Sequence, residues 1–281
     1  MSSIIDGAVI DRPIGGAPGA LAPTKERTKT QIEERKALWL RIAFLVFVVL
    51  LWELLASTGA VDARFTSKPS AIVQALGGLA VNPEALGAVG ETLLAFAIAF
   101  VIGTGSGLVL GIAFGLNRLL RDAYYPIIML LMVVPKSVFL PLLVLFFGLG
   151  TAAGIAFGAI LAFVHVTVNV VAGLDLVDQK YRDVGRAYDA KLARLLLDVI
   201  LPAAAPGIFA GLWHGIRNGF IGVVIAQLFV STAGIGYLVR IYSNNFQIDN
   251  AMALTLVMAA LVIVTGEVWS RLERRLTRWR D

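Results

Sequence analysis

The chain of 281 residues contains no cysteine and few charged residues. The lack of cysteine excludes disulfides, thiolate zinc sites and iron–sulfur clusters. Charged residues make up 15% of the chain and hydrophobic residues 58%, whereas an ordinary soluble domain is roughly 25% charged. The apolar residues stand in long uncharged runs, each near the roughly 20 residues that a bilayer crossing requires. The sequence therefore predicts an all-α integral membrane protein.

The sequence also lacks the motifs of common catalytic and nucleotide-binding sites. It has no His-Glu-x-x-His, no Gly-x-Ser-x-Gly and no Gly-x4-Gly-Lys-Ser/Thr. Its two histidines have no carboxylates at metal-ligand spacing. We therefore expect no catalytic residue, no metal site and no cofactor in this chain.

The apolar runs predict about six transmembrane helices. The expected spans are residues 38–57, 88–116, 124–147, 152–173, 203–230 and 251–270. Residues 1–36 are polar, rich in glycine and proline near their start, and predicted to form a disordered cytoplasmic tail before a membrane domain at 37–281. Between the first two spans, the amphipathic run 70–79 predicts a short interfacial helix on the outer side.

Most of the 24 Lys and Arg residues lie in the N-terminal tail, the second-to-third loop, the fourth-to-fifth loop and the C-terminus. The alternate loops hold few basic residues. The positive-inside rule therefore places both termini in the cytoplasm. Because the basic residues follow membrane topology, the net charge of +5 gives no support to a nucleic-acid partner.

Two spans carry glycine at every fourth position. These rows are Gly103, Gly107, Gly111 and Gly115 in the second span, and Gly207, Gly211, Gly215 and Gly219 in the fifth. A phosphate-binding loop is the alternative for residues 103–107, but the required spacing and the Lys-Ser/Thr ending are absent. Rows of small residues let helix backbones approach closely in lipid, so we expect both rows to be packing surfaces.

Several polar side chains fall near the centres of the third, fourth and fifth spans. They are Lys136, His165 with Asn169, and Arg217 with His214 and Asn218. Charges at this depth are costly in lipid and should face a protein interior or a wet cavity. One hypothesis is a cationic translocation path for a small anion. The alternative is that each group is satisfied by a backbone carbonyl or by a carboxylate such as Glu91, and for the two histidines this alternative is favoured.

The third span also contains prolines that interrupt helical hydrogen bonding. Pro135 and Pro141 bracket Lys136, and Gly148 to Gly150 end the span. A helix broken at mid-membrane depth is a recurrent feature of transport pathways.

Residues 175–202, between the fourth and fifth spans, form a long charged cytoplasmic segment. One helical face of it is apolar, at Val184, Tyr188, Leu192, Leu195 and Val199. Periodicity alone favours a solvated interfacial helix over an element that docks onto a partner.

The residues of this segment resemble a known family. Asp183-Val184-Gly185-Arg186-Ala187-Tyr188-Asp189, followed after nine residues by Val199 and then by Leu201-Pro202, resembles the Glu-Ala-Ala-x3-Gly-x9-Ile-x-Leu-Pro loop of binding-protein-dependent ABC importer permeases. The prolines and glycines of the third span, and Gly234 to Leu238 after the fifth, are similar to the taurine, nitrate and sulfonate branch. The resemblance covers about 88–272. Asp183, Val184, Gly185 and Asp189 depart from the motif, and Gln227 stands where a Glu is usual.

The resemblance implies a type I ABC importer transmembrane domain in the bacterial inner membrane. It implies a dimer of identical chains, two cytoplasmic subunits that bind ATP and Mg, and an extracytoplasmic substrate-binding protein. The segment would be a coupling helix, with contact residues Asp183, Val184, Gly185, Arg186, Tyr188, Asp189, Leu201 and Pro202. The expected path residues are Pro135, Lys136, His165, Asn169, Arg217 and Gln227, and the expected cargo is a sulfonate, nitrate or related organic acid.

Two alternatives stay open at this point. A secondary transporter or channel would work without an ATPase, although coupling to ions usually needs intramembrane carboxylates and paired repeats. A purely structural membrane subunit would explain fewer of these features.

Overall fold

The computed structural model describes residues 26–59, 62, 66–178, 180 and 194–276. Every regular element in this part of the chain is a helix. The chain divides into two units, Met1–Trp52 and Glu53–Asp281. The first unit contains most of α1 (Glu26–Ser57), and the second contains the remaining helices.

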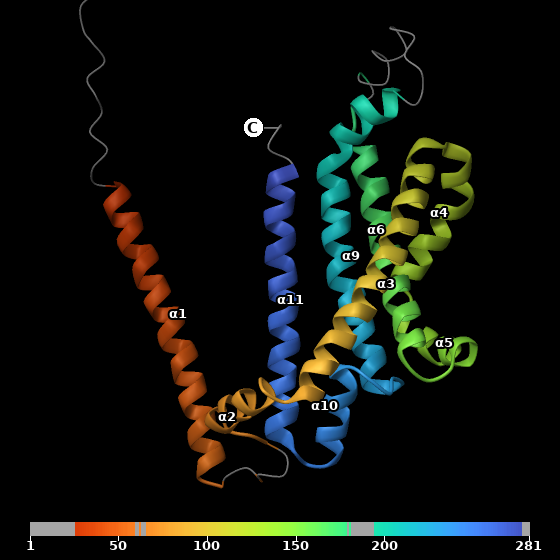
Figure 1. Cartoon of the computed structure of the whole chain (residues 1–281). Helices are drawn as coiled ribbons and strands as arrows, with labels where there is room; N and C mark the ends of the chain where they lie inside the picture. The colour runs from red at the N-terminus through yellow and green to blue at the C-terminus, as the bar shows by residue number, and fades with distance from the viewer. Residues whose placement is uncertain (1–25, 60–61, 63–65, 179, 181–193, 277–281) are drawn as a thin grey trace, which may run out of the picture. The chain divides into compact units, whose positions relative to one another are not determined.

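The second unit is built from long apolar helices joined by short ones (Figure 1). Its elements are α2 (Pro69–Leu79), α3 (Pro83–Leu116), α4 (Arg118–Val133), η1 (Lys136–Val138), α5 (Phe139–Phe147), α6 (Thr151–Asp175), η2 (Leu195–Ile200), α9 (Leu201–Phe229), α10 (Ile235–Asn244) and α11 (Ile248–Leu276). The element η1 is a 3₁₀ turn, and η2 is a π-helix that runs into α9.

The described residues contain five helices long and apolar enough to cross a membrane, and a sixth crossing if one bent pair is a single span. The prediction of about six spans is therefore confirmed in this sense. The bent pair is the predicted third span, in which α4 and the η1–α5 stretch meet at 93°. The bend falls at Pro135, as expected, because proline forces the preceding Val134 into an extended conformation with ψ of 134°. Pro141 lies in the first turn of α5, where its missing N–H costs no helical hydrogen bond.

The helices differ from the sequence prediction most clearly at α1 and α10. The helix α1 begins at Glu26, so the final part of the tail expected at 1–36 is helical, and residues 1–25 lie outside the described part. The long polar start of α1 shows no apolar period, which is why it was assigned to the tail. The helix α10 was not predicted, because its 10 residues are too few for a span. The predicted short helix at 70–79 is confirmed as α2, one residue longer.

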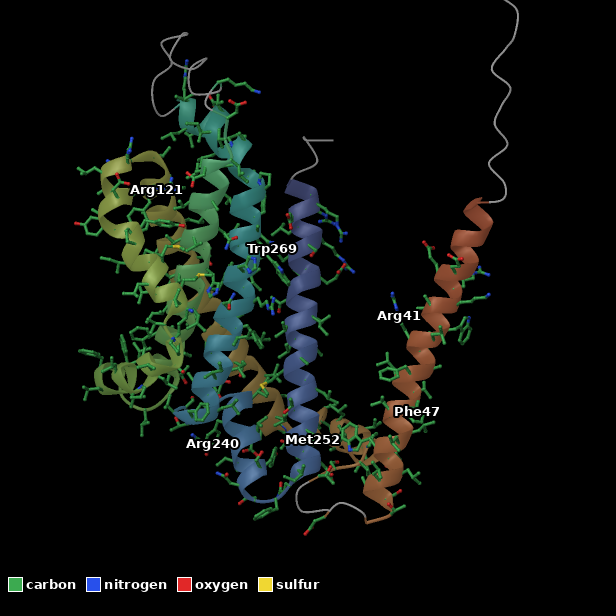
Figure 2. All side chains as sticks on the ribbon, turned by 180° about the vertical axis from the view of Figure 1, so that it is seen from behind. Arg41, Phe47, Arg121, Arg240, Met252 and Trp269 are labelled. Atoms are coloured by element: carbon green, nitrogen blue, oxygen red, sulfur yellow. The ribbon has the colours of Figure 1, made fainter. Side chains whose placement is uncertain are left out.

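The loops expected on one side of the membrane lie at one end of the second unit. The α3–α4 turn, the start of α9 and the end of α11 are together at this basic end, whereas α2 and α10 lie at the other end, named here the α10 end (Figure 1). Figure 2 likewise shows Arg121 toward the basic end and Arg240 toward the α10 end. At the basic end Arg121 of α4 donates to both carboxylate oxygens of Asp175 of α6, at 2.5 and 2.7 Å.

The helix α6 is the centre of the bundle, and both glycine rows pack against it. In the apolar 18-residue stretch of each span, 56% of the residues are buried in α6, compared with 33% in α3 and 22% in the span that contains α9. A Cβ atom on Gly107 of α3 would lie 2.9 Å from the Cβ of Val166, and one on Gly215 of α9 would lie 2.7 Å from the Cγ2 of the same valine. Only residues without a side chain let two helices approach α6 this closely.

The remaining glycines of the two rows also meet α6. The nearest α6 residues are Ala159 and Ala162 for Gly103, Val170 for Gly111, Leu174 for Gly115, Gly173 for Gly207, Asn169 for Gly211 and Ala162 for Gly219. Because lipid supplies no hydrophobic drive between helices, this backbone contact and its dispersion energy hold α3, α6 and α9 together.

These contacts predict that one methyl group at the α3–α6 seam destabilises the bundle. A Cβ on Gly103 would overlap the Ala159 carbonyl oxygen and lie 2.8 Å from the Ala162 Cβ, whereas Gly105 on the same helix has no atom within 4 Å of its Cβ position. We expect Gly103→Ala to cost about 1–3 kcal/mol and lower the melting temperature in detergent. Gly105→Ala should leave it unchanged or slightly raised. Equal melting temperatures for the two variants would contradict the packing role.

Candidate functional site

The helix α9 carries an exposed stripe with an arginine in it. Its exposed residues Ala203, Pro206, Ala210, Arg217 and Ile221 recur at i, i+3, i+7, i+14 and i+18, which is a single helical face. Within the described residues, Arg217 takes part in none of the ion pairs or hydrogen bonds. An unpaired guanidinium well inside a span is too costly to face lipid. The stripe must therefore face water or another protein surface.

Lys136 lies at the break between α4 and α5 and caps the helix that precedes it. Its Nζ donates to the carbonyl oxygen of Met132 at 3.0 Å. In an unbroken helix the backbone N–H of residue 136 would bond this carbonyl, so the side chain replaces a bond lost at the break after Pro135. The ammonium charge itself has no carboxylate partner among the described residues.

His165 of α6 lies near two other basic side chains. Lys136 and His214 of α9 are both close enough to act on its ring electrostatically, and no carboxylate in the described part of the chain does so. Its Nδ1 bonds the Leu161 carbonyl oxygen at 2.8 Å, four residues earlier. The structure thus brings together basic side chains from η1, α6 and α9.

The two predicted asparagines bond their own helices. Asn169 and Asn218 each donate from Nδ2 to the carbonyl oxygen four residues earlier, that of His165 and His214, at 2.8 Å. These bonds give each amide nitrogen a backbone carbonyl partner on its own helix, which is the alternative to a role in the path. Each amide retains its oxygen as a free acceptor, and both side chains are half-buried.

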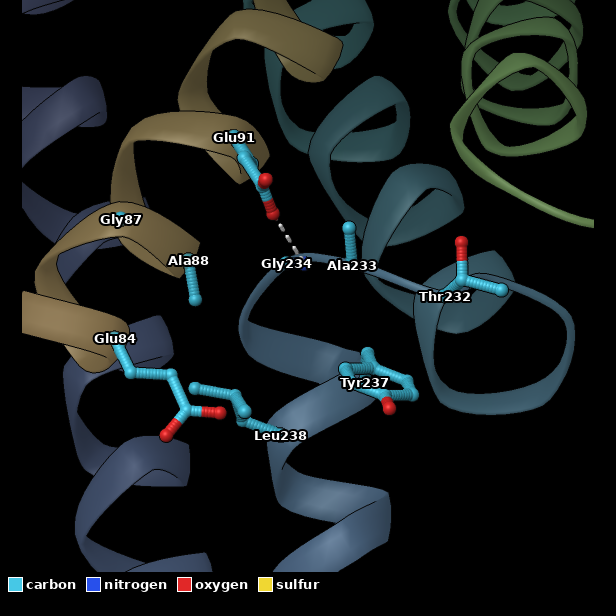
Figure 3. Close-up of a pocket in the computed structure, with 9 residues that line it drawn as sticks. All are labelled: Glu84, Gly87, Ala88, Glu91, Thr232, Ala233, Gly234, Tyr237 and Leu238. Atoms are coloured by element: carbon cyan, nitrogen blue, oxygen red, sulfur yellow. Dashed lines mark hydrogen bonds between the residues drawn. The ribbon is translucent and has the colours of Figure 1, made fainter.

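Glu91 does not neutralise the basic groups. Its Oε2 accepts a hydrogen bond from the backbone N–H of Gly234 at 2.9 Å, at the start of α10 (Figure 3). Among the described residues Glu91 forms no ion pair with Lys136 or Arg217, and Lys136 is bonded to a backbone carbonyl, the other partner that the alternative named. The Gly234 N–H donates to the Glu91 carboxylate because the first N–H groups of a helix have no acceptor within the helix.

Gln227, expected in the path with Lys136 and Arg217, contacts neither of these residues through a hydrogen bond. Its side chain is 2% exposed. The Oε1 atom accepts from Thr92 Oγ1 at 2.9 Å and from the Gly236 N–H at 3.2 Å, between α3, α9 and α10. No local pattern predicts this contact, because Thr92 and Gln227 are far apart in the chain and belong to two different spans.

A cavity opens beside this contact. It has a volume of about 300 Å³ and lies between the first turns of α3 and α10 (Figure 3). Its lining includes the carboxylates of Glu84 and Glu91 and the ring of Tyr237. No group of three or more His, Asp or Glu side chains suited to a metal ion is present among the described residues.

The coupling residues fall at the limit of the described chain. Asp183, Val184, Gly185, Arg186, Tyr188 and Asp189 lie outside it. Leu201 and Pro202 form the first turn of α9, directly after the π-helix η2. Near the start of the predicted segment, hydrogen bonds from the Lys180 side chain and backbone hold the pKa of the Asp178 carboxyl below its usual range.

Known proteins resemble this chain over most of its length. A protein of Bacillus subtilis (strain 168) described as an aliphatic sulfonates transport permease is 29% identical over 267 residues, covering 94% of this chain and 97% of the relative. The taurine transport system permease of Escherichia coli (strain K12) is 34% identical over 173 residues, covering 62% and 63%. Among solved structures, a chain of the inward-facing MetNI methionine ABC transporter shares the fold, with a TM-score of 0.58 at 18% identity, covering 69% of this chain and 94% of that one.

The family described as the binding-protein-dependent transport system inner membrane component matches residues 103–280. The matched part runs from the first glycine of the α3 row to the end of α11, and it includes α6, α9 and the whole coupling segment. Its members are permease subunits, without catalytic residues of their own. The chain therefore belongs to this family and is a multi-pass permease of the inner membrane.

Proposed function

We propose that the chain forms the translocation path of an ATP-driven importer for a small anionic solute. The observation that carries this proposal is Arg217, an arginine within a membrane span, on an exposed helical face, with no partner in the described part of the chain. A positive charge kept free at this depth attracts anions and repels cations.

The neighbouring basic groups support an anionic cargo. Lys136 and His214 lie near His165, and no carboxylate among the described residues acts on this histidine. The relatives are named for aliphatic sulfonates and taurine, compounds that carry a negatively charged sulfonate group. A path with the cations Lys136 of η1 and Arg217 of α9 has the charge that such cargo requires.

The chain needs partners for its energy source and its cargo. It has no Gly-x4-Gly-Lys-Ser/Thr of its own, so we assign ATP and Mg to two separate cytoplasmic ATP-binding subunits. An extracytoplasmic binding protein would deliver the solute. A second copy of the chain would cover the exposed α9 stripe and close the path, which suits an arginine that cannot face lipid.

The start of α9 suits a mechanical link between the ATPase and the path. We propose that the coupling helix, with Asp183 at the start of its motif, docks onto the ATP-binding subunit. Leu201 and Pro202 begin α9, and this helix continues without a break to Phe229. A displacement of the coupling segment would thus reach Arg217 through one rigid element.

A secondary transporter or channel remains the alternative function. Ion coupling in such proteins usually relies on intramembrane carboxylates. Glu91, a carboxylate within the second predicted span, is bonded to the Gly234 backbone instead. This arrangement favours the ATP-driven function.

Replacing Arg217 should weaken anion transport. We expect Arg217→Ala to lower uptake at least tenfold, the effect of losing about 1.4 kcal/mol of interaction free energy. Arg217→Lys should lose less, because it keeps the charge but not the guanidinium geometry. The measurement is uptake of a radiolabelled sulfonate into vesicles that contain the complete complex. Unchanged uptake with Arg217→Ala would remove the arginine from the path.

Reversing the charge of Asp183 should separate ATP hydrolysis from transport. We expect Asp183→Lys to abolish uptake while the ATP-binding subunits still hydrolyse ATP, because the docking contact is lost. The control is Asp122→Lys, an exposed carboxylate at the basic end paired only with Arg118 on its own helix. Normal uptake per ATP in Asp183→Lys would refute the docking assignment.

A further inference from the structure

The start of α10 is capped by side chains from two other helices. The N–H groups of Gly234, Ile235 and Gly236 donate in turn to Glu91 Oε2, Thr92 Oγ1 and Gln227 Oε1, at 2.9, 2.9 and 3.2 Å. A helix N-terminus usually receives its cap from the residues just before it. Here all three acceptors come from α3 and α9, so the hydrogen bonds that begin α10 also fix its position against these helices.

Two of the three acceptors are fully enclosed and bonded to each other. Thr92 is 0% exposed and Gln227 is 2% exposed, and the single hydroxyl hydrogen of Thr92 has two acceptors at 2.9 Å, Gln227 Oε1 and the Ala88 carbonyl oxygen. A Cβ atom on Gly236 would lie 2.6 Å from the Gln227 Cβ, so only glycine leaves room for the glutamine beside α10. The contact therefore needs both residues: a glycine at 236, which leaves space, and a glutamine at 227, whose side-chain oxygen accepts from the Gly236 N–H.

A second tie connects α10 with the end of α9. Arg240 donates from Nη1 to the Phe229 carbonyl oxygen and from Nη2 to that of Ser231, both at 2.8 Å. These carbonyls belong to the last residue of α9 and the turn that follows it, where no helical N–H remains to bond them. The end of α9 is thus held by α10 through Gln227 and Arg240, ten and more residues beyond Arg217 on the same helix.

The opposite side of the contact is open. The cavity of about 300 Å³ separates Glu84 of α3 from Tyr237 of α10 (Figure 3). On its inner side α10 also packs on α3, because Ile235 and Leu238 share a buried apolar cluster with Ala85 and Ala88. The hydrogen bonds of Thr92 to α10 and of Gln227 between α9 and α10 add directional contacts at the edge of this cluster. Because these directional contacts lie beside an open space, they are the part of the attachment that a movement of α10 breaks first.

We propose that Gln227 and Thr92 are positioning residues for transport, holding α10 and the end of α9 in the resting state, and that α10 separates from α3 during the cycle. The inference rests on the proposed function, because it concerns the far end of the helix that carries Arg217. It assigns to Gln227 a role through α10 and not a contact with cargo.

The first test compares two substitutions of the glutamine. Gln227→Leu removes the acceptor, whereas Gln227→Glu retains an oxygen for both Thr92 and Gly236. We expect Gln227→Leu to raise ATP hydrolysis in the absence of binding protein at least about threefold and to lower the maximal uptake rate, with the KM for the solute unchanged. Gln227→Glu should restore both values. A Gln227→Leu complex with wild-type hydrolysis and uptake would overturn the proposal.

The second test does not depend on a substitution in the contact and uses the lack of cysteine in the chain. Glu84→Cys and Tyr237→Cys place two unique thiols across the cavity, to be joined by a short bifunctional methanethiosulfonate reagent in the assembled complex. We expect the bridged complex to lose uptake and to recover it with dithiothreitol, while each single variant keeps its uptake after the same treatment. A bridged complex that transports normally would refute separation of α10 from α3.

Uptake by the unmodified complex in the same vesicles distinguishes failure of the proposed function from failure of the positioning role. If it shows no ATP-dependent uptake of any anion, the proposed function fails. If it transports, and both Gln227→Leu and the bridged variant transport equally well, only the positioning role fails.

Discussion

Backbone contact of α6 with α3 and α9 is the constraint on which the rest of the structure depends. In lipid, moving an apolar side chain from the acyl chains to a neighbouring helix brings no hydrophobic free energy. The attraction between helices must therefore come from close packing. Val166 illustrates the geometry, because glycines of both neighbours lie against its side chain. With α3 and α9 fixed on α6, the polar residues of these helices have defined positions, and the contact of Thr92 with Gln227 becomes possible.

In this arrangement one helix, α9, joins the coupling segment, the proposed path and the contact with α10. Its first turn adjoins the coupling segment, its middle carries Arg217 on an exposed stripe, and its last turns are bonded to α10. The cost of an unpaired charge within the membrane is tolerable only if that stripe meets water or protein. A rigid helix with such a face is suited to carry movement from an ATPase to a charged path.

Much of the fold followed from local patterns, but the contacts at the α10 end did not. Apolar runs predicted the spans, and the proline at 135 predicted the break, because both effects act within one helix. The glycine rows predicted close packing without naming α6 as their common partner, since spacing alone does not specify a neighbour. The path role expected for Gln227 rested on the family resemblance, in which it stands where a Glu is usual. Its partners Thr92 and Gly236 depend on tertiary contact, as does the engagement of Glu91 by Gly234.

The most direct test of the central claim is purification of the C-terminally tagged chain from membranes of its native host in mild detergent, followed by an assay of ATP hydrolysis. The account predicts that an ATP-binding subunit co-purifies and that the preparation hydrolyses ATP in a vanadate-sensitive manner. Isolation of the chain alone, with no hydrolysis under conditions that preserve its helical bundle, would contradict an ATP-driven permease and favour a channel or secondary transporter.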